Sequence, residues 1–319
     1  MNTLTLNSYA KLNLYLEVLN KRKDNYHNIK TIFERIDLAD KIILKSRPDK
    51  KINITCNVTA VPQGHSNLAW RSAKLLQDSF NIDNGVDIKI IKRIPVGSGL
   101  GGGSSNAAGV LVGLNKLWKL NLTENKLAGL AKKLGCDVPF FIYNSPFAQG
   151  EARGDKIKPL KALYFVRLWH ILVVPKLEVS TASIYKKWDA ECSYVRSYAS
   201  ASRRVTRDEN FIRDKYFKAF KLTRPKYNVT MLLLALKKNN FFLLGDALFN
   251  SLERVSARLY PQINAIKEKL MQLGAKSILM SGSGPAVMAI VSSRKEALSL
   301  SRQLKKNSFF GEVFVTRTI

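Results

Sequence analysis

The feature that most constrains this chain is a glycine-rich segment between a predicted strand and a predicted helix. Residues 95–106 have the sequence PVGSGLGGGSSN, with five glycines among the seven positions from Gly97 to Gly103. Strand periodicity precedes the segment over residues 86–94, and helical periodicity follows it over 106–118. Glycine lacks the Cβ that blocks close approach, and backbone N–H groups beside a helix N-terminus can converge on an anion. The segment therefore predicts a phosphate-binding loop.

This loop differs from two common phosphate-binding patterns. The P-loop requires a lysine directly after its last glycine, and this chain has none there. The glycines also lack the dinucleotide-binding spacing with its downstream acid. A flexible glycine linker is the other alternative. A linker would need neither the flanking strand and helix nor the polar cap residues Ser104, Ser105 and Asn106, so phosphate binding is favoured.

The remaining pattern predicts a β-rich opening followed by alternating strands and helices. The predicted strands of the first half are 3–7, 13–19, 29–38, 41–45 and 52–58, and its other helices are 67–80, with Asn67 as N-cap, and 124–134. The predicted elements of the second half are a strand at 170–174, helices at 231–238, 241–259 and 262–273, strands at 277–280 and 286–291, and a final helix and strand. Residues 191–228 are basic without a clear period, which predicts a mobile or inserted arm.

Length and charge add two expectations. At roughly 100–200 residues per domain, 319 residues predict two domains, which we place at 1–165 and 166–319. The 52 Lys and Arg against 24 Asp and Glu give a net charge of +28. One interpretation is attraction to a polyanion such as RNA, to a membrane surface or to a phosphorylated metabolite. The other is a solvated basic surface without a dedicated partner. The basic residues are scattered along the chain, which favours the second interpretation.

Several classes of protein are excluded by the same sequence. The most apolar stretch, 163–174, contains Arg167 and His170, so no membrane span is predicted. The first sixteen residues lack an apolar signal core. Three widely spaced cysteines provide neither a disulfide framework nor a paired zinc-ligand pattern. We therefore expect a cytoplasmic protein.

Three further motifs carry candidate functional groups, each with an ordinary alternative. Asp137 follows a helix stop and precedes a predicted apolar strand, as either a turn aspartate or a base at a cleft wall. Lys11 and Asn13 share one face of an early strand, where a lone lysine is usually solvated. Residues 281–285, SGSGP, form either a hairpin connection or a second backbone cradle.

In order and sequence these motifs resemble those of the GHMP kinase superfamily, named for galactokinase, homoserine, mevalonate and phosphomevalonate kinases. The matching stretches are 10–14, Tyr26-His27 with Phe33, 95–106, 137–141 and 153–155. They are most similar to the members that phosphorylate the 2-hydroxyl of a cytidine-diphosphate derivative of methylerythritol in non-mevalonate isoprenoid biosynthesis. The resemblance implies an α+β fold of two domains, an N-terminal α/β domain like that of ribosomal protein S5 and a C-terminal α+β domain, with the active site in the cleft between them.

The resemblance also implies roles for individual residues. Asp137 accepts the hydroxyl proton, Lys11 steadies the developing negative charge, and Mg²⁺ accompanies ATP, with either Ser104 or Ser105 as a candidate ligand. The implied ATP-binding residues are Pro95, Gly97, Gly99, Leu100, Gly101, Gly102, Gly103, Ser104, Ser105, Asn106 and Asn67. The implied substrate-binding residues are Asn13, Tyr26, His27, Phe33, Thr181 and Tyr185.

Two departures from the family pattern bear on these roles. Asn25 stands where glycine is common before Tyr26-His27, and asparagine is predicted to serve because it also visits positive φ. The basic segment 191–228 is longer than expected and follows Thr181 and Tyr185 closely. Two other functions remain open: a GHMP kinase for a different alcohol, and an RNA-binding protein built on the same kind of domain. A monomer or a weak homodimer is expected.

Overall fold

The computed structural model describes residues 2–201, 225–226, 228–306 and 311–319. The chain divides into two compact units, each made of more than one stretch. Unit 1 comprises Met1–Asn13, Leu19–Trp169 and Thr316–Ile319, and unit 2 comprises Leu14–Val18 and His170–Val315. Each unit therefore draws on sequence from both halves of the chain.

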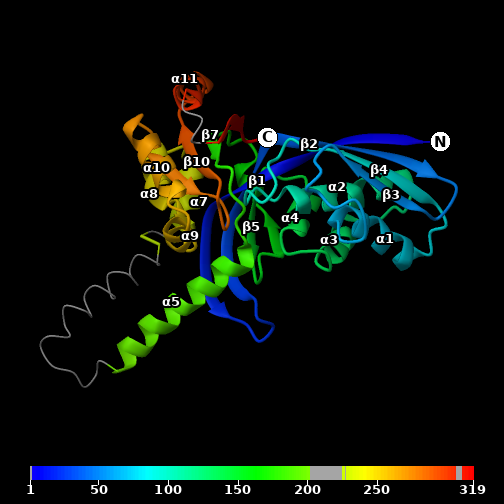
Figure 1. Cartoon of the computed structure of the whole chain (residues 1–319), viewed down its shortest axis with the longest axis horizontal. Helices are drawn as coiled ribbons and strands as arrows, with labels where there is room; N and C mark the ends of the chain where they lie inside the picture. Colours follow the sequence, from blue (N-terminus) through cyan, green and yellow to red (C-terminus); the bar gives the residue numbers. More distant parts are fainter. Residues whose placement is uncertain (1, 202–224, 227, 307–310) are drawn as a thin grey trace, which may run out of the picture. The chain divides into compact units, whose positions relative to one another are not determined.

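Unit 1 is built around a sheet in which the first two strands, drawn in blue in Figure 1, are much longer than the others. Its strands are β1 (Thr3–Lys21, apart from residues 14–18), β2 (His27–Arg47), β3 (Ile52–Cys56), β4 (Gly85–Ile91), β5 (Phe147–Glu151) and β6 (Lys156–Pro159). The order is β3-β4-β2-β1, and β5 pairs with β2 and with β6. Buried Val86, Ile88 and Ile90 alternate with more exposed residues along β4, so the predicted apolar face of that strand is confirmed.

Four helices pack on this sheet. They are α1 (Leu68–Phe80), α2 (Gly102–Leu117), α3 (Glu124–Ala131) and α4 (Val138–Ile142), with a 3-10 turn at Lys161–Leu163. One core joins them to the sheet, with Leu76 of α1, Leu111 of α2 and Phe140 of α4 packed among Ile42 and Ile88. The predicted cap of α1 is confirmed, since Asn67 Oδ1 accepts a hydrogen bond from the backbone N–H of Ala69 at 2.9 Å.

Unit 2 contains a four-stranded sheet of order β11-β7-β10-β9. These strands are β7 (Trp169–Val174), β9 (Ser277–Met280), β10 (Val287–Val291) and β11 (Glu312–Arg317). The short β8 (Phe249–Asn250) pairs in parallel with residues 15–16 of β1. The described helices of the unit are α5 (Thr181–Ala201), α7 (Val229–Lys237), α8 (Phe241–Ala247), α9 (Glu253–Leu259), α10 (Gln262–Gln272) and α11 (Arg294–Lys305).

Two sequence predictions of local structure are wrong in an informative way. Residues 138–142 form the short helix α4 rather than a strand, because Pro139 suits a first helical turn and every residue is buried, which leaves no period to distinguish the two. Residues 241–259 form two helices separated by β8 rather than one. The side chain of Asn250 bonds the carbonyls of Met280 and Gly282 at 2.8 and 2.7 Å, which holds this position out of a helix.

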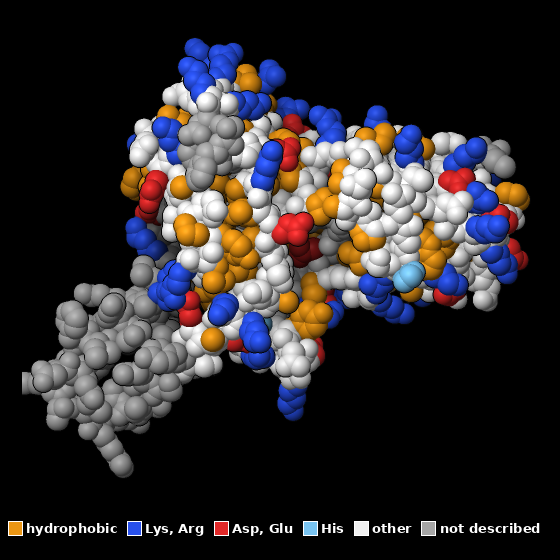
Figure 2. Space-filling view, viewed as in Figure 1, with side chains coloured by type: hydrophobic (Ala, Val, Ile, Leu, Met, Phe, Trp, Pro, Cys, Tyr) orange, Lys and Arg blue, Asp and Glu red, His pale blue; other side chains and the backbone are white. Residues whose placement is uncertain are grey.

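The basic segment 191–228 falls largely outside the described residues. Its first part, up to Ala201, continues α5, and the mobile or inserted arm otherwise stays a prediction. In the described part of the chain, no helix has the length and apolarity needed to cross a membrane. On the face drawn in Figure 2, lysine and arginine side chains are spread over many elements with acidic side chains among them.

Candidate active site

The glycine-rich segment joins β4 to α2 as the sequence predicts, but the helix begins earlier than expected. Gly101 is the N-cap of α2, so residues 102–105 form its first turn and not part of the loop. The first intrahelical bond of this turn runs from the Ser105 N–H to the Gly101 carbonyl at 2.8 Å. No side chain caps the helix, so the amides of residues 102–104, which precede the first intrahelical bond, can meet an anion.

Gly101 occupies a position that no other residue fits well. Its φ is +72°, and a Cβ there would lie 3.0 Å from the ring of Phe141 and 3.1 Å from Cγ of Lys11. The preceding carbonyl, that of Leu100, accepts a hydrogen bond from the Lys11 N–H at 3.0 Å. A backbone hydrogen bond thus joins the loop to β1, and the Phe141 ring of α4 lies close to Gly101.

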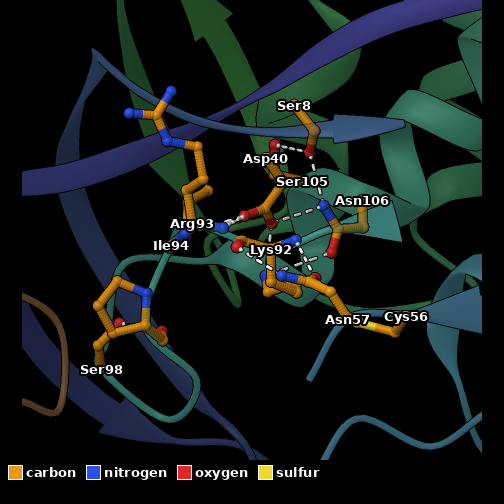
Figure 3. Close-up of polar contacts among 11 residues, drawn as sticks. Ser8, Asp40, Cys56, Asn57, Lys92, Arg93, Ile94, Ser98, Ser105 and Asn106 are labelled. Carbon is orange, nitrogen blue, oxygen red and sulfur yellow. Dashed lines mark hydrogen bonds and ion pairs between the residues drawn. The ribbon is translucent and has the colours of Figure 1, made fainter. Parts of the chain in front are cut away.

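A buried acid ties the loop to the sheet (Figure 3). The fully buried carboxylate of Asp40, on β2, pairs with the ammonium of Lys92 and accepts a hydrogen bond from Asn106 Nδ2 at 2.9 Å. It also accepts the backbone N–H groups of Arg93 and Ile94 at 2.7 and 2.8 Å. One side chain thereby links the end of β4, the entrance of the loop and the first turns of α2.

The network continues through two buried hydroxyls. Asn106 Nδ2 also donates to Ser8 Oγ at 2.9 Å, and Ser8 Oγ donates to Ser105 Oγ at 2.7 Å. Ser105 and Asn106 are therefore engaged with the protein, whereas Ser104 in the same turn is partly exposed. Of the two serines predicted as metal-ligand candidates, Ser104 has the accessible hydroxyl.

Sequence reasoning missed Asp40 and Lys92, although a signal was present. Asp40 lies in phase with the buried residues Leu38 and Ile42 of β2, and Lys92 lies in phase with Ile90 of β4. The antiparallel register of β2 and β4 brings positions 40 and 92 opposite each other. Charges of opposite sign on the apolar phase of neighbouring strands could have been recognised as a buried pair.

The two predicted catalytic residues lie together. Lys11 Nζ is 3.5 Å from Asp137 Oδ2, and it donates to Asn13 Oδ1 at 2.5 Å. The lysine side chain is only 4% exposed, which contradicts the solvated alternative, whereas that of Asp137 is 35% exposed. Asn13 in turn donates to Thr31 at 2.8 Å. Next to the start of α2, the accessible carboxylate can deprotonate a hydroxyl, and the buried ammonium beside it can stabilise an anion.

Asp137 precedes α4 as its N-cap residue, and its side chain makes no capping bond. The helix carries Phe140 against the ring of Phe33 at 4.9 Å, and Lys11 Nζ lies 5.6 Å from the same Phe33 ring. Phe33 itself is 1% exposed, so this predicted substrate residue belongs to the wall beneath Lys11.

The turn between β1 and β2 carries Tyr26, and His27 is the first residue of β2. Asn25 has a φ of +63°, so the expectation that asparagine takes the glycine conformation is confirmed. Tyr26 is 50% exposed. The guanidinium of Arg153 lies 5.0 Å from the centroid of the Tyr26 ring and donates to Asp155 at 2.6 Å. His27 is buried. The exposed ring of Tyr26 is thus suited to stacking.

In unit 2, Thr181 begins α5 and lies beside the glycine turn 281–285. Thr181 Oγ1 is 2.8 Å from Ser283 Oγ, and the Ser283 carbonyl accepts a bond from Ser256 at 3.0 Å. This turn connects β9 to β10, as the hairpin interpretation expects. Tyr185 lies one turn further along α5, partly exposed.

The described residues contain no cluster of three or more His, Cys, Asp or Glu side chains suited to hold a metal on their own. Mg²⁺ in kinases is usually held by one or two protein groups together with substrate phosphates. The partly exposed Ser104 hydroxyl, in the first turn of α2, is an oxygen donor of that kind, so the residues present fit a Mg²⁺–nucleotide complex.

Comparison with known proteins defines the class. Residues 67–145 match the model of the GHMP kinases N terminal domain, and residues 232–309 match that of the GHMP kinases C terminal domain. The fold resembles a homoserine kinase from Cytophaga hutchinsonii with a TM-score of 0.67 at 18% identity, over 100% of this chain and 95% of that one. The chain belongs to the GHMP kinase family and is an ATP-dependent phosphotransferase acting on a small molecule.

Proteins with higher sequence identity to this chain share a name. The 4-diphosphocytidyl-2-C-methyl-D-erythritol kinase of Gloeobacter violaceus is 37% identical over 100% of this chain and 95% of its own length. The kinase of that name from Moorella thermoacetica is 37% identical over 100% of both. A crystal structure of 4-(cytidine 5'-diphospho)-2C-methyl-D-erythritol kinase matches with a TM-score of 0.75 and 29% identity over 98% of both chains.

Proposed function

We propose that this protein transfers the γ-phosphoryl group of ATP to the 2-hydroxyl of 4-diphosphocytidyl-2-C-methyl-D-erythritol. The observation that carries the proposal is the Lys11–Asp137 pair, 3.5 Å apart, with the Lys11 backbone bonded to the glycine loop. The full-length similarity to kinases of that name supports this alcohol over others.

The proposed reaction assigns a role to each of these groups. Asp137 accepts the hydroxyl proton as the oxygen attacks the γ-phosphorus, the bond to the β-phosphate oxygen breaks, and ADP leaves. Lys11 stabilises the charge that develops on the transferring group. Asn13 holds the lysine ammonium in place, which fixes the geometry before the substrates arrive.

The ATP phosphates would lie at the first turn of α2. Pro95 begins the loop, the residues from Val96 to Ser104 would supply backbone amides, and Asn67 and Asn106 act through the contacts that shape the site. Mg²⁺, which Ser104 and phosphate oxygens would hold, would supply charge neutralisation when bound.

The cytidine end of the substrate would be recognised by Tyr26 and His27. An exposed aromatic ring suits stacking on a pyrimidine, and a histidine presents two ring nitrogens to a base edge. The other proposed substrate-binding residues are Asn13 and Phe33 in unit 1 and Thr181 and Tyr185 in unit 2. We also propose that the protein works in the cytoplasm as a monomer or a weak homodimer.

The test is ADP release by purified protein with Mg-ATP and 4-diphosphocytidyl-2-C-methyl-D-erythritol, beside a reaction without the alcohol and the Asp137→Asn variant. Alcohol-dependent release that the variant loses is the expected result. A folded protein that binds ATP without such release would point to another alcohol, to be found with a substrate panel. A protein that binds RNA in a salt-dependent way and binds no ATP would overturn the kinase assignment.

A further inference from the structure

A buried arginine contacts the helix that follows Asp137 and is not itself a member of the proposed catalytic pair. Arg35 is on β2 and only 6% exposed. Its Nη2 donates to the carbonyl oxygens of Tyr143 at 2.5 Å, Phe140 at 3.3 Å and Phe141 at 3.4 Å. Burial lowers the pKa of Arg35 to about 10, so the guanidinium is charged at neutral pH. Within the described residues it forms no salt bridge with a carboxylate, and its Nε has no hydrogen-bond partner.

The carbonyls that Arg35 meets are those at the C-terminal end of α4. The last carbonyls of a helix lack intrahelical partners and carry partial negative charge, which a buried cation can satisfy. A helix of five residues is too short to be stable alone, so its position depends on such contacts. The guanidinium also lies 5.4 Å from the ring centroid of Phe140, which adds a cation–π contact.

Asp137 is at the other end of the same helix. Because its side chain makes no capping bond, the course of α4 sets where the carboxylate lies relative to Lys11. Phe33 stands two residues before Arg35 on β2, and its ring packs under both Phe140 and Lys11. The same strand therefore holds both members of the pair, the lysine through Phe33 and the aspartate through Arg35 and α4.

We propose that Arg35 is a positioning residue, which fixes α4 from its C-terminal end and so keeps Asp137 opposite Lys11. This proposal rests on the proposed role of Asp137 as the base. Arg35 touches backbone carbonyls and an aromatic ring, so its effect on the reaction passes through the helix.

The experiment compares Arg35→Met and Arg35→Lys with Arg71→Met, a change of an exposed arginine on α1. Hydrogen exchange measured on peptides from α4 and from α2 reports the local effect, and kcat and KM for ATP report the reaction. We expect exchange to accelerate in α4 and not in α2. We also expect kcat to fall about 10- to 100-fold with KM for ATP within about twofold, since small displacements of a catalytic group cost this much.

Arg35→Lys keeps the charge but concentrates it on one ammonium, so a smaller loss of kcat and a smaller acceleration are expected; it also serves if the methionine variant does not fold. Wild-type kcat in a folded Arg35→Met protein would overturn the proposal, as would exchange that accelerates equally in α2 and α4. If the wild type lacked the kinase activity, the proposed function would fail separately. Exchange would still decide whether Arg35 holds α4.

Discussion

Asp40 and Lys92 form an ion pair inside unit 1, in which the aspartate side chain is fully buried and that of the lysine is 5% exposed. Removing one member of such a pair leaves an uncompensated buried charge. Asp40→Asn should therefore lower the free energy of unfolding by about 3–5 kcal/mol, measured by urea denaturation. The exposed pair Lys50–Asp83 provides the matched control, and Asp83→Asn should change stability by less than about 1 kcal/mol. Similar effects of both substitutions would contradict the buried role.

Lys11→Met should abolish most of the turnover while leaving a folded protein. The methionine retains an unbranched apolar side chain and removes the ammonium, which lies beside Asp137 and 5.6 Å from the Phe33 ring centroid. A loss of about 10²–10³ in kcat is expected for removing one group that stabilises the transition state, measured by ADP release. Lys74→Met, on the exposed face of α1, should retain wild-type kcat. A small loss in Lys11→Met would instead indicate a purely structural lysine.

Gly101→Ala should impair ATP binding. The added methyl meets Phe141 and Lys11 in a backbone conformation with a φ of +72°, which alanine adopts at a cost. We expect a rise in the Kd for ATP, measured by calorimetry, together with a lower melting temperature. Gly129→Ala in α3 is the control, because no atom lies within 4 Å of the place that its methyl group would take and helical alanine should stabilise by about 0.5–1 kcal/mol. Unchanged ATP binding in Gly101→Ala would refute this role for the position.

Tyr26→Ala should weaken binding of the cytidine substrate and spare that of ATP. Loss of one stacking ring costs about 1–3 kcal/mol, which corresponds to a rise in the KM for the alcohol of roughly 5- to 150-fold. Tyr26→Phe keeps the ring and should stay near wild type. Equal KM values for the alanine and phenylalanine variants would exclude stacking at this position.

Cys136, next to Asp137, should react slowly with alkylating reagents at neutral pH. Burial disfavours its thiolate and raises the pKa of the thiol to about 11. The rate of iodoacetamide labelling at this residue should therefore keep rising about tenfold per pH unit toward pH 11, whereas a free cysteine levels off near about pH 8.5. Peptide mass spectrometry measures the rate. Levelling at the lower pH would show an exposed thiol.

The sequence was sufficient for the parts of the fold whose burial follows a simple period. The alternation of Val86, Ile88 and Ile90 and the cap Asn67 located β4 and α1 closely. Residues 138–142 were misassigned because a fully buried segment shows no period, and only the proline hinted at a helix.

The site divides in the same way. Both Lys11 and Asp137 belong to stretches that resemble one family, so their proximity could be predicted from the motifs. Asp40 and Arg35 could not be identified in this way, because their importance comes from partners distant in sequence: the lysine that directly follows β4 and the carbonyls at the end of α4. A single strand pattern shows which phase is buried, but not which group lies opposite a buried charge.

Residues 316–319 belong to unit 1, although in the sequence they follow all of its other segments and the whole of unit 2. Thr318 accepts the Leu168 N–H at 2.8 Å and donates to the buried Glu34 carboxylate at 2.6 Å. A ribosome synthesises β2 early, yet Glu34 meets this hydroxyl only after β11 has been translated. Most of unit 1 can collapse once residues 19–169 have been synthesised, but its closure waits for residues 316–319, so a nascent fragment ending near Trp169 would carry a buried acid that still lacks its contact with Thr318.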